Sequence, residues 1–169
     1  MIHLLRTIHI LAGVIWVGGV FFLAAFVLPS ARAVGPAAGP MMGQLTQVRQ
    51  VPRFLLYAGF LTIGAGFWLY WIASAGGNPE WMSSGPAKVY GVGAIFAVAA
   101  WITGMTLSMP LAKRLGAFAA RISASGVPPN AEEQAQLAAM QARLGMLAAV
   151  AATLLILATA AMAVARYVS

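Results

Sequence analysis

The sequence predicts an all-α integral membrane protein, a four-helix bundle that forms one transmembrane domain over residues 1–169. Three observations predict this class. Hydrophobic residues make up 62% of the chain and charged residues only 8%, and the mean hydropathy is +0.87. A water-soluble domain carries roughly 25% charged residues, so a soluble globular fold is excluded and the lipid bilayer is the expected partner.

Four apolar stretches are each long enough to cross a bilayer, since a spanning helix needs about 20 apolar residues. They cover residues 8–28, 54–74, 89–109 and 144–165. Residues 29–53 and 110–143 would form two inner loops, and residues 75–88 one outer loop. The first inner loop is rich in Gly and Pro, so we expect it to lie on the inner surface without regular helix.

The start of the fourth helix can be predicted more closely. Asn130 follows two prolines and is followed three residues later by Glu133. An Asn and a Glu at this spacing form a capping box, in which each side chain binds the other residue's backbone N–H. We therefore expect the fourth helix to begin near Ala131, before the chain enters the bilayer.

The positive charges predict the orientation, because Lys and Arg near spans stay on the cytoplasmic side. Seven of the ten basic residues flank the inner loops: Arg32, Arg49, Arg53, Lys113, Arg114, Arg121 and Arg143. An aromatic belt marks the other face: Tyr70, Trp71, Trp81, Tyr90 and Tyr167. We expect a multi-pass protein of the inner (plasma) membrane with both termini outside. The net charge of +7 then reflects topology and attraction to anionic lipid, and no nucleic-acid partner is expected.

Ionisable groups are almost absent from the spans. The chain has no Asp, and its three Glu lie in loops or at a helix start. Because carboxylates usually carry protons and cations through a bilayer, a proton-coupled pump or ion channel is difficult to build here. The chain also has no Cys, which excludes thiolate metal sites. His9 and Lys88 remain, each at the entrance of a span that runs from outside to inside.

His9 shares a helix face with small and aromatic residues. Ala12, Gly13 and Trp16 follow it at three, four and seven residues. This face would give a porphyrin an axial imidazole, room beside the backbone and an apolar edge. Basic residues for the propionates would be Arg6, Lys88 and Arg166. Close helix packing and interfacial hydrogen bonding explain the same residues without a ligand, so both interpretations stay open.

A second axial histidine cannot come from another helix of the same chain. His3 is also on the first helix and is turned about 240° from His9. A sixth ligand would be Lys88, a methionine, water or a histidine of a second subunit, so a homodimer would supply what one chain lacks. Methionine pairs offer a copper alternative, since thioethers suit Cu(I): Met105 and Met109, and Met41 and Met42.

Three segments resemble the CopD-type copper-resistance superfamily. They are "HILAGVIWVGGVFFLAAFVLP", "VPRFLLYAGFLTIGAG" and "GPAKVYGVGAIF", in three of the four spans. The residues that match the family's motifs are His9, Trp16, Gly18, Gly19, Arg53 and Lys88. The related HemJ-type protoporphyrinogen oxidases are similar in placing a histidine on the first helix and a lysine on a later one. Their second histidine is replaced here by "FVLPSAR".

The resemblance implies b-type heme or porphyrin binding by His9, with Lys88 important. The expected function is therefore a heme b protein with a redox or electron-transfer role near the outer membrane face. His9 would be the metal ligand, and a quinone or porphyrin would be the substrate. Enzyme activity stays open; as an enzyme the chain would be an oxidoreductase using heme b. The alternatives are a copper-handling CopD-like transporter and a cofactor-free structural subunit of a membrane complex.

Overall fold

A computed structural model describes residues 1–168 and confirms the all-α four-helix bundle. Within these residues the chain forms no strand. Four continuous helical segments are long and apolar enough to cross a membrane: Ile2–Val34, Val51–Ala73, Gly85–Ala124 and Ala131–Tyr167. The protein is therefore a multi-pass membrane protein.

The first and third segments are composite helices. The first consists of α1 (Ile2–Phe22), a π-helical turn (Leu23–Val27) and α2 (Leu28–Val34). The third consists of α6 (Gly85–Ile102), a π-helical turn (Thr103–Ser108) and α7 (Met109–Ala124). In each case a proline, Pro29 or Pro110, lies two residues after the end of the π-helical turn. A π-helical turn shifts the backbone hydrogen-bond register, which accommodates the N–H that proline lacks. The helices therefore continue past the expected span ends.

The other two segments are simpler. They are α4 (Val51–Ala73), and α8 (Ala131–Val164) with a final 3₁₀ turn (Ala165–Tyr167). Residues 35–48, expected as loop, form a 3₁₀ turn (Gly35–Ala38), the short α3 (Gly39–Gly43) and a π-helical turn (Gln44–Val48). A short α5 (Pro79–Met82) lies in the outer loop. The predicted capping box is confirmed: the Glu133 N–H donates to Asn130 Oδ1 (2.8 Å) and the Asn130 N–H to Glu133 Oε2 (2.9 Å).

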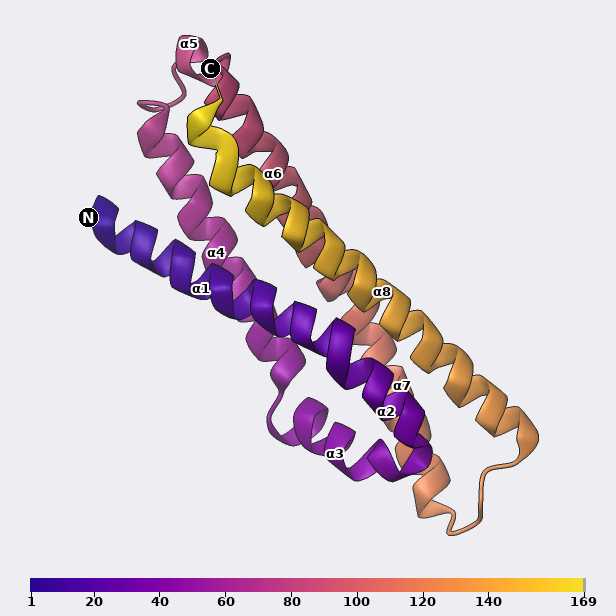
Figure 1. The fold of residues 1–169 in the computed structure, drawn as a ribbon. Coiled ribbons are helices and arrows are strands. Elements are labelled where there is room, and N and C mark those ends of the chain that lie inside the picture. The colour runs from indigo at the N-terminus through magenta and orange to yellow at the C-terminus, as the bar shows by residue number, and fades with distance from the viewer. Residues whose placement is uncertain (169) are drawn as a thin grey trace.

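Both termini and α5 lie at one end of the bundle (Figure 1), which we call the termini end. The opposite end carries α3 and the turn between α7 and α8, and we call it the basic end after its seven Lys and Arg residues. Helix α1 packs along α4, and α6 packs along α8. Contacts between these two helix pairs are fewer, so the bundle is built from an α1–α4 pair and an α6–α8 pair.

One buried residue from each long helix forms the centre of the core. Trp16, Leu55, Ala100 and Leu155 come from α1, α4, α6 and α8. The Trp101 indole N–H donates to the Leu56 carbonyl (3.0 Å) and joins α6 to α4. Large apolar side chains such as Tyr57 (72% exposed) and Ile95 (68%) cover the outside. An apolar exterior of this kind suits a lipid environment.

Candidate functional site

His9 belongs to α1, and its imidazole packs against α4. Its half-buried imidazole Nδ1 is 2.8 Å from the backbone carbonyl oxygen of Thr62. A carbonyl oxygen only accepts hydrogen bonds, so Nδ1 carries the proton in this contact, and in the neutral imidazole Nε2 is then the nitrogen with the lone pair. Metal-bound histidines commonly have this arrangement, because the second nitrogen fixes the tautomer and the orientation of the ring.

A glycine on α4 makes room for the ring. A Cβ at Gly66 would lie 2.8 Å from His9 Cε1 and 3.1 Å from Nδ1, distances at which either group would have to move. The imidazole therefore lies directly against the backbone of α4. Gly66 is seven residues before the end of α4 at Ala73, about 10 Å along the helix axis. His9 thus sits deeper, relative to α4, than the boundary position that its own span predicts.

The small and aromatic residues that share the His9 face also contact α4. A Cβ at Gly13 would be 3.4 Å from Thr62 Cγ2, so Thr62 occupies the space beside Gly13. Trp16 is only 3% exposed and lies over Gly59. Where it meets α4, the His9 face of α1 is therefore a helix-packing surface. A macrocycle bound to His9 would have to lie on the side of the imidazole that faces away from α4.

The predicted basic partners are exposed on the half of the bundle nearer the termini end: Arg6, Lys88 and Arg166. Arg6 precedes His9 by three residues and shares its face of α1. The Arg166 guanidinium lies 4.6 Å above the Tyr167 ring and donates to the Tyr167 hydroxyl. Lys88 lies in the first turn of α6, which packs mainly on α8. Over residues 1–168 no hydrogen bond links any of the three to His9.

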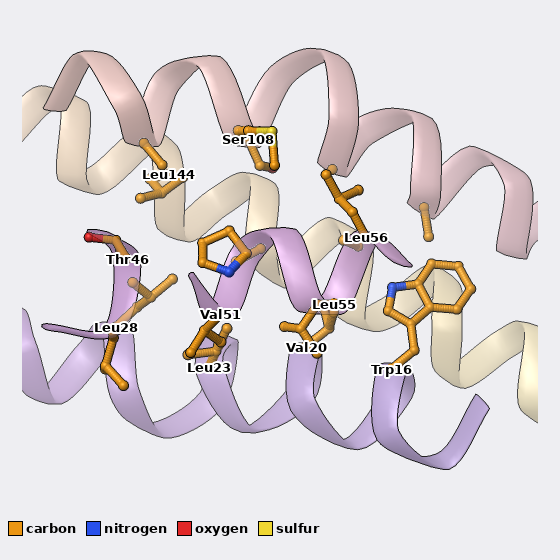
Figure 2. Close-up of a pocket in the computed structure, with 18 of the residues that line it drawn as sticks. Trp16, Val20, Leu23, Leu28, Thr46, Val51, Leu55, Leu56, Ser108 and Leu144 are labelled. Carbon is orange, nitrogen blue, oxygen red and sulfur yellow. The ribbon is translucent and has the colours of Figure 1, made fainter. Parts of the chain in front are cut away.

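A separate, apolar cavity of about 150 Å³ lies between the two helix pairs (Figure 2). It begins at Trp16 and extends toward the basic end. Trp16 lies at one end of it, and Thr46 and Leu144 lie at the other. His9 does not line this cavity. Pockets for drug-sized ligands measure roughly 300–1,000 Å³, so a porphyrin does not fit there, and the cavity and His9 are distinct features.

Only some of the methionines of the copper alternative line this cavity. Met42 and Met109 both line it, whereas Met41 and Met105 are exposed. Each predicted pair thus contributes one thioether to a common space. Among residues 1–168, no group of three or more His, Asp or Glu side chains is placed to hold a metal ion.

Two residues of the site were not predicted from the sequence. Thr62 supplies the carbonyl that holds His9, and Gly66 supplies the space. The sequence signal for Gly66 is a glycine within a span rich in aromatic residues, in "IGAGFW". Gly64 gives the same signal, although nothing lies within 4 Å of its Cβ position. The signal therefore does not distinguish the two glycines. Comparison with family models, curated proteins and solved structures finds no match, so family membership stays a prediction.

Proposed function

We propose that the protein binds a b-type heme through Nε2 of His9 and takes part in electron transfer near the outer face of the plasma membrane. One observation carries the proposal: the contact between Nδ1 and the Thr62 carbonyl orients the imidazole, and in the neutral ring it makes Nε2 the nitrogen that can bind a metal. A half-buried histidine without an acidic partner is otherwise rare in a membrane helix.

The surrounding residues would divide the work of binding. His9 would ligate the iron, and Gly66 would keep the imidazole against α4. Arg6, on the same helix face, would pair with a propionate; Lys88 and Arg166 are further candidates at the termini end. When bound, the heme would supply one-electron redox chemistry. A quinone-like or porphyrin-like substrate would exchange electrons with it.

The proposal favours a homodimer. The Thr62 carbonyl of α4 engages Nδ1 and the imidazole is only half-buried, so a second copy of the chain could cover the rest of the ring and bring a second His9. This would satisfy the sixth coordination position without Lys88. Cross-linking of a cysteine introduced at exposed Leu11, in the otherwise Cys-free chain, would report whether two α1 helices meet.

The test is an oxidised-minus-reduced visible spectrum of the detergent-purified protein after hemin reconstitution. We expect a Soret band and an α-band that disappear in His9→Ala and persist in His3→Ala, since His3 is exposed and is turned about 240° from His9 around the helix. Size-exclusion and circular dichroism profiles check that both variants fold. A flat spectrum in the native protein contradicts the proposal and favours the cofactor-free subunit.

A copper-handling role is the second candidate, favoured by the two methionines that line one cavity. Two thioethers in an apolar space suit Cu(I) better than any harder ion. Cu(I) titration should show one site that weakens when Met42 and Met109 are both replaced by Leu. The matched control replaces the exposed Met41 and Met105. Equal binding in the two double variants would contradict a copper site in the cavity.

A further inference from the structure

An open groove lies at the basic end, between α7 and the N-terminal part of α8. Its volume is about 680 Å³. Three arginines line it, Arg114, Arg121 and Arg143, together with apolar side chains that include Leu111, Phe118 and Met140. It shares no lining residue with the cavity beside Trp16 and is far along the chain from His9. The groove is therefore a feature separate from the proposed heme site, and any role it has is independent of that site.

The arginines approach the groove from both walls. Arg114 and Arg121 are seven residues apart on α7, a spacing that places them on one helix face. Arg143 comes from α8, which runs antiparallel to α7 (Figure 1). The Arg121 guanidinium lies 5.1 Å from the centre of the Phe118 ring. This cation–π contact holds a charge against the apolar floor.

The protein has few carboxylates with which to neutralise these charges. Its acidic side chains are Glu80, Glu132 and Glu133. Glu80 belongs to α5 at the termini end, and the Glu133 carboxylate is engaged in the capping box. Glu132 is exposed in the first turn of α8. Three arginines and an apolar floor therefore suit a ligand that is anionic at one part and apolar at another.

The depth of the groove indicates where that ligand comes from. Arg143 directly precedes the fourth predicted span, and Arg114 follows the end of the third by five residues, about 7 Å of helix. The headgroup layer on each side of a bilayer is roughly 5–8 Å thick. The predicted span ends thus place Arg114 and Arg143 at headgroup depth, and Arg121 farther from the hydrocarbon.

We propose that the α7–α8 groove is a binding site for an anionic phospholipid. Arg114 and Arg143 bind the phosphodiester, the apolar floor contacts the glycerol and upper acyl chains, and Arg121 attracts the headgroup from the aqueous side. Basic recesses between membrane helices on the cytoplasmic side are suited to this chemistry, and paired guanidiniums bind phosphate oxygens with directed hydrogen bonds.

The test is native mass spectrometry of the full-length protein in detergent, titrated with phosphatidylglycerol or with phosphatidylcholine of the same acyl chains. We expect saturable binding of phosphatidylglycerol that weakens about 100-fold in the triple variant Arg114→Gln, Arg121→Gln, Arg143→Gln. The matched control is Arg49→Gln, Arg53→Gln, Lys113→Gln. It removes the same charge from exposed residues of the same end that do not line the groove, and it should retain binding within a few-fold.

Three results would overturn the proposal. An equal loss of phosphatidylglycerol binding in the two triple variants would mean that the lipid is attracted by the overall positive charge of this end and is not bound by the groove. Equal binding of phosphatidylcholine would remove the role of the anionic headgroup. Displacement of the lipid by millimolar inorganic phosphate would identify a soluble phosphate as the ligand. If the triple variant does not fold, the single variants Arg114→Gln and Arg143→Gln test the same contact, each with an expected loss of about fivefold.

Discussion

The two helix pairs of the bundle achieve close packing in different ways. In the α1–α4 pair, large rings lie over glycines of the opposite helix: Trp16 over Gly59 and His9 over Gly66. In the α6–α8 pair the contact is between small residues. A Cβ at Gly93 would meet the Ala161 Cβ at 3.2 Å and the Ala158 carbonyl oxygen at 3.3 Å.

The α1–α4 interface is therefore specific for one arrangement of the two helices, whereas the α6–α8 interface is of a general kind. Small residues on both sides let two helix backbones approach, which is the usual basis of membrane helix association. A ring placed in a glycine gap fixes the register of the two helices and also the orientation of the ring. The α1–α4 pair therefore orients the His9 imidazole, whereas the α6–α8 pair brings two helix backbones close together.

The largest expected effect comes from filling the gap under Trp16. In Gly59→Leu, the new Cβ would lie 2.7 Å from Trp16 Cε2 and 2.8 Å from Trp101 Cδ1. Two indoles would have to move, so we expect the free energy of unfolding in detergent to fall by about 3 kcal/mol. Gly64→Leu is the control, since Gly64 is on the same helix and has open space at its Cβ position. Similar losses in both variants would show that any substitution of this helix is harmful and that the ring contact is not special.

Gly66→Ala should have a smaller effect on stability and a specific effect on His9. The added Cβ would lie 2.8 Å from His9 Cε1, so the imidazole must leave the Thr62 carbonyl. We expect a loss of about 1 kcal/mol in stability and roughly tenfold weaker hemin binding, a typical cost when a partner that orients a metal ligand is lost. Hemin titration beside Gly64→Ala measures this. Unchanged hemin binding in a folded Gly66→Ala protein would contradict a role for the oriented ring.

Gly93→Ala tests the other side of the comparison. The new Cβ would lie 3.1 Å from Met162 Cε, which is flexible, but 3.3 Å from the Ala158 carbonyl oxygen, which belongs to a helix backbone. We expect a loss of about 1 kcal/mol in unfolding free energy with no change in hemin affinity. A change in hemin affinity as large as that of Gly66→Ala would show that the two helix pairs are not functionally distinct.

The sequence predicted the features that depend on local pattern. The four spans follow from apolar runs, and the start of α8 follows from Asn130 and Glu133, because both ends of that capping box lie within four residues. The continuation of α2 past Pro29 was not predicted, since a helix-breaking residue is accommodated by a π-helical turn that has no clear sequence signal. The partners of His9 were not predicted either. Thr62 is 53 residues away, and only the register of two packed helices brings it to the imidazole.

The smallest expected effect sharpens the assignment of the His9 contact. Thr62→Val keeps the side-chain shape that fills the space beside Gly13 and removes the hydroxyl, which donates to the Ala58 carbonyl (2.8 Å) within the same helix. Such a bond contributes little to stability, so we expect a loss of about 0.5 kcal/mol. Hemin affinity should not change, because His9 binds the main-chain oxygen of residue 62 and that oxygen remains. Hemin titration of Thr62→Val beside Gly66→Ala therefore separates two causes. If Thr62→Val weakens hemin binding as much as Gly66→Ala does, the hydroxyl and not the carbonyl holds the ring, and the tautomer argument for a free Nε2 fails.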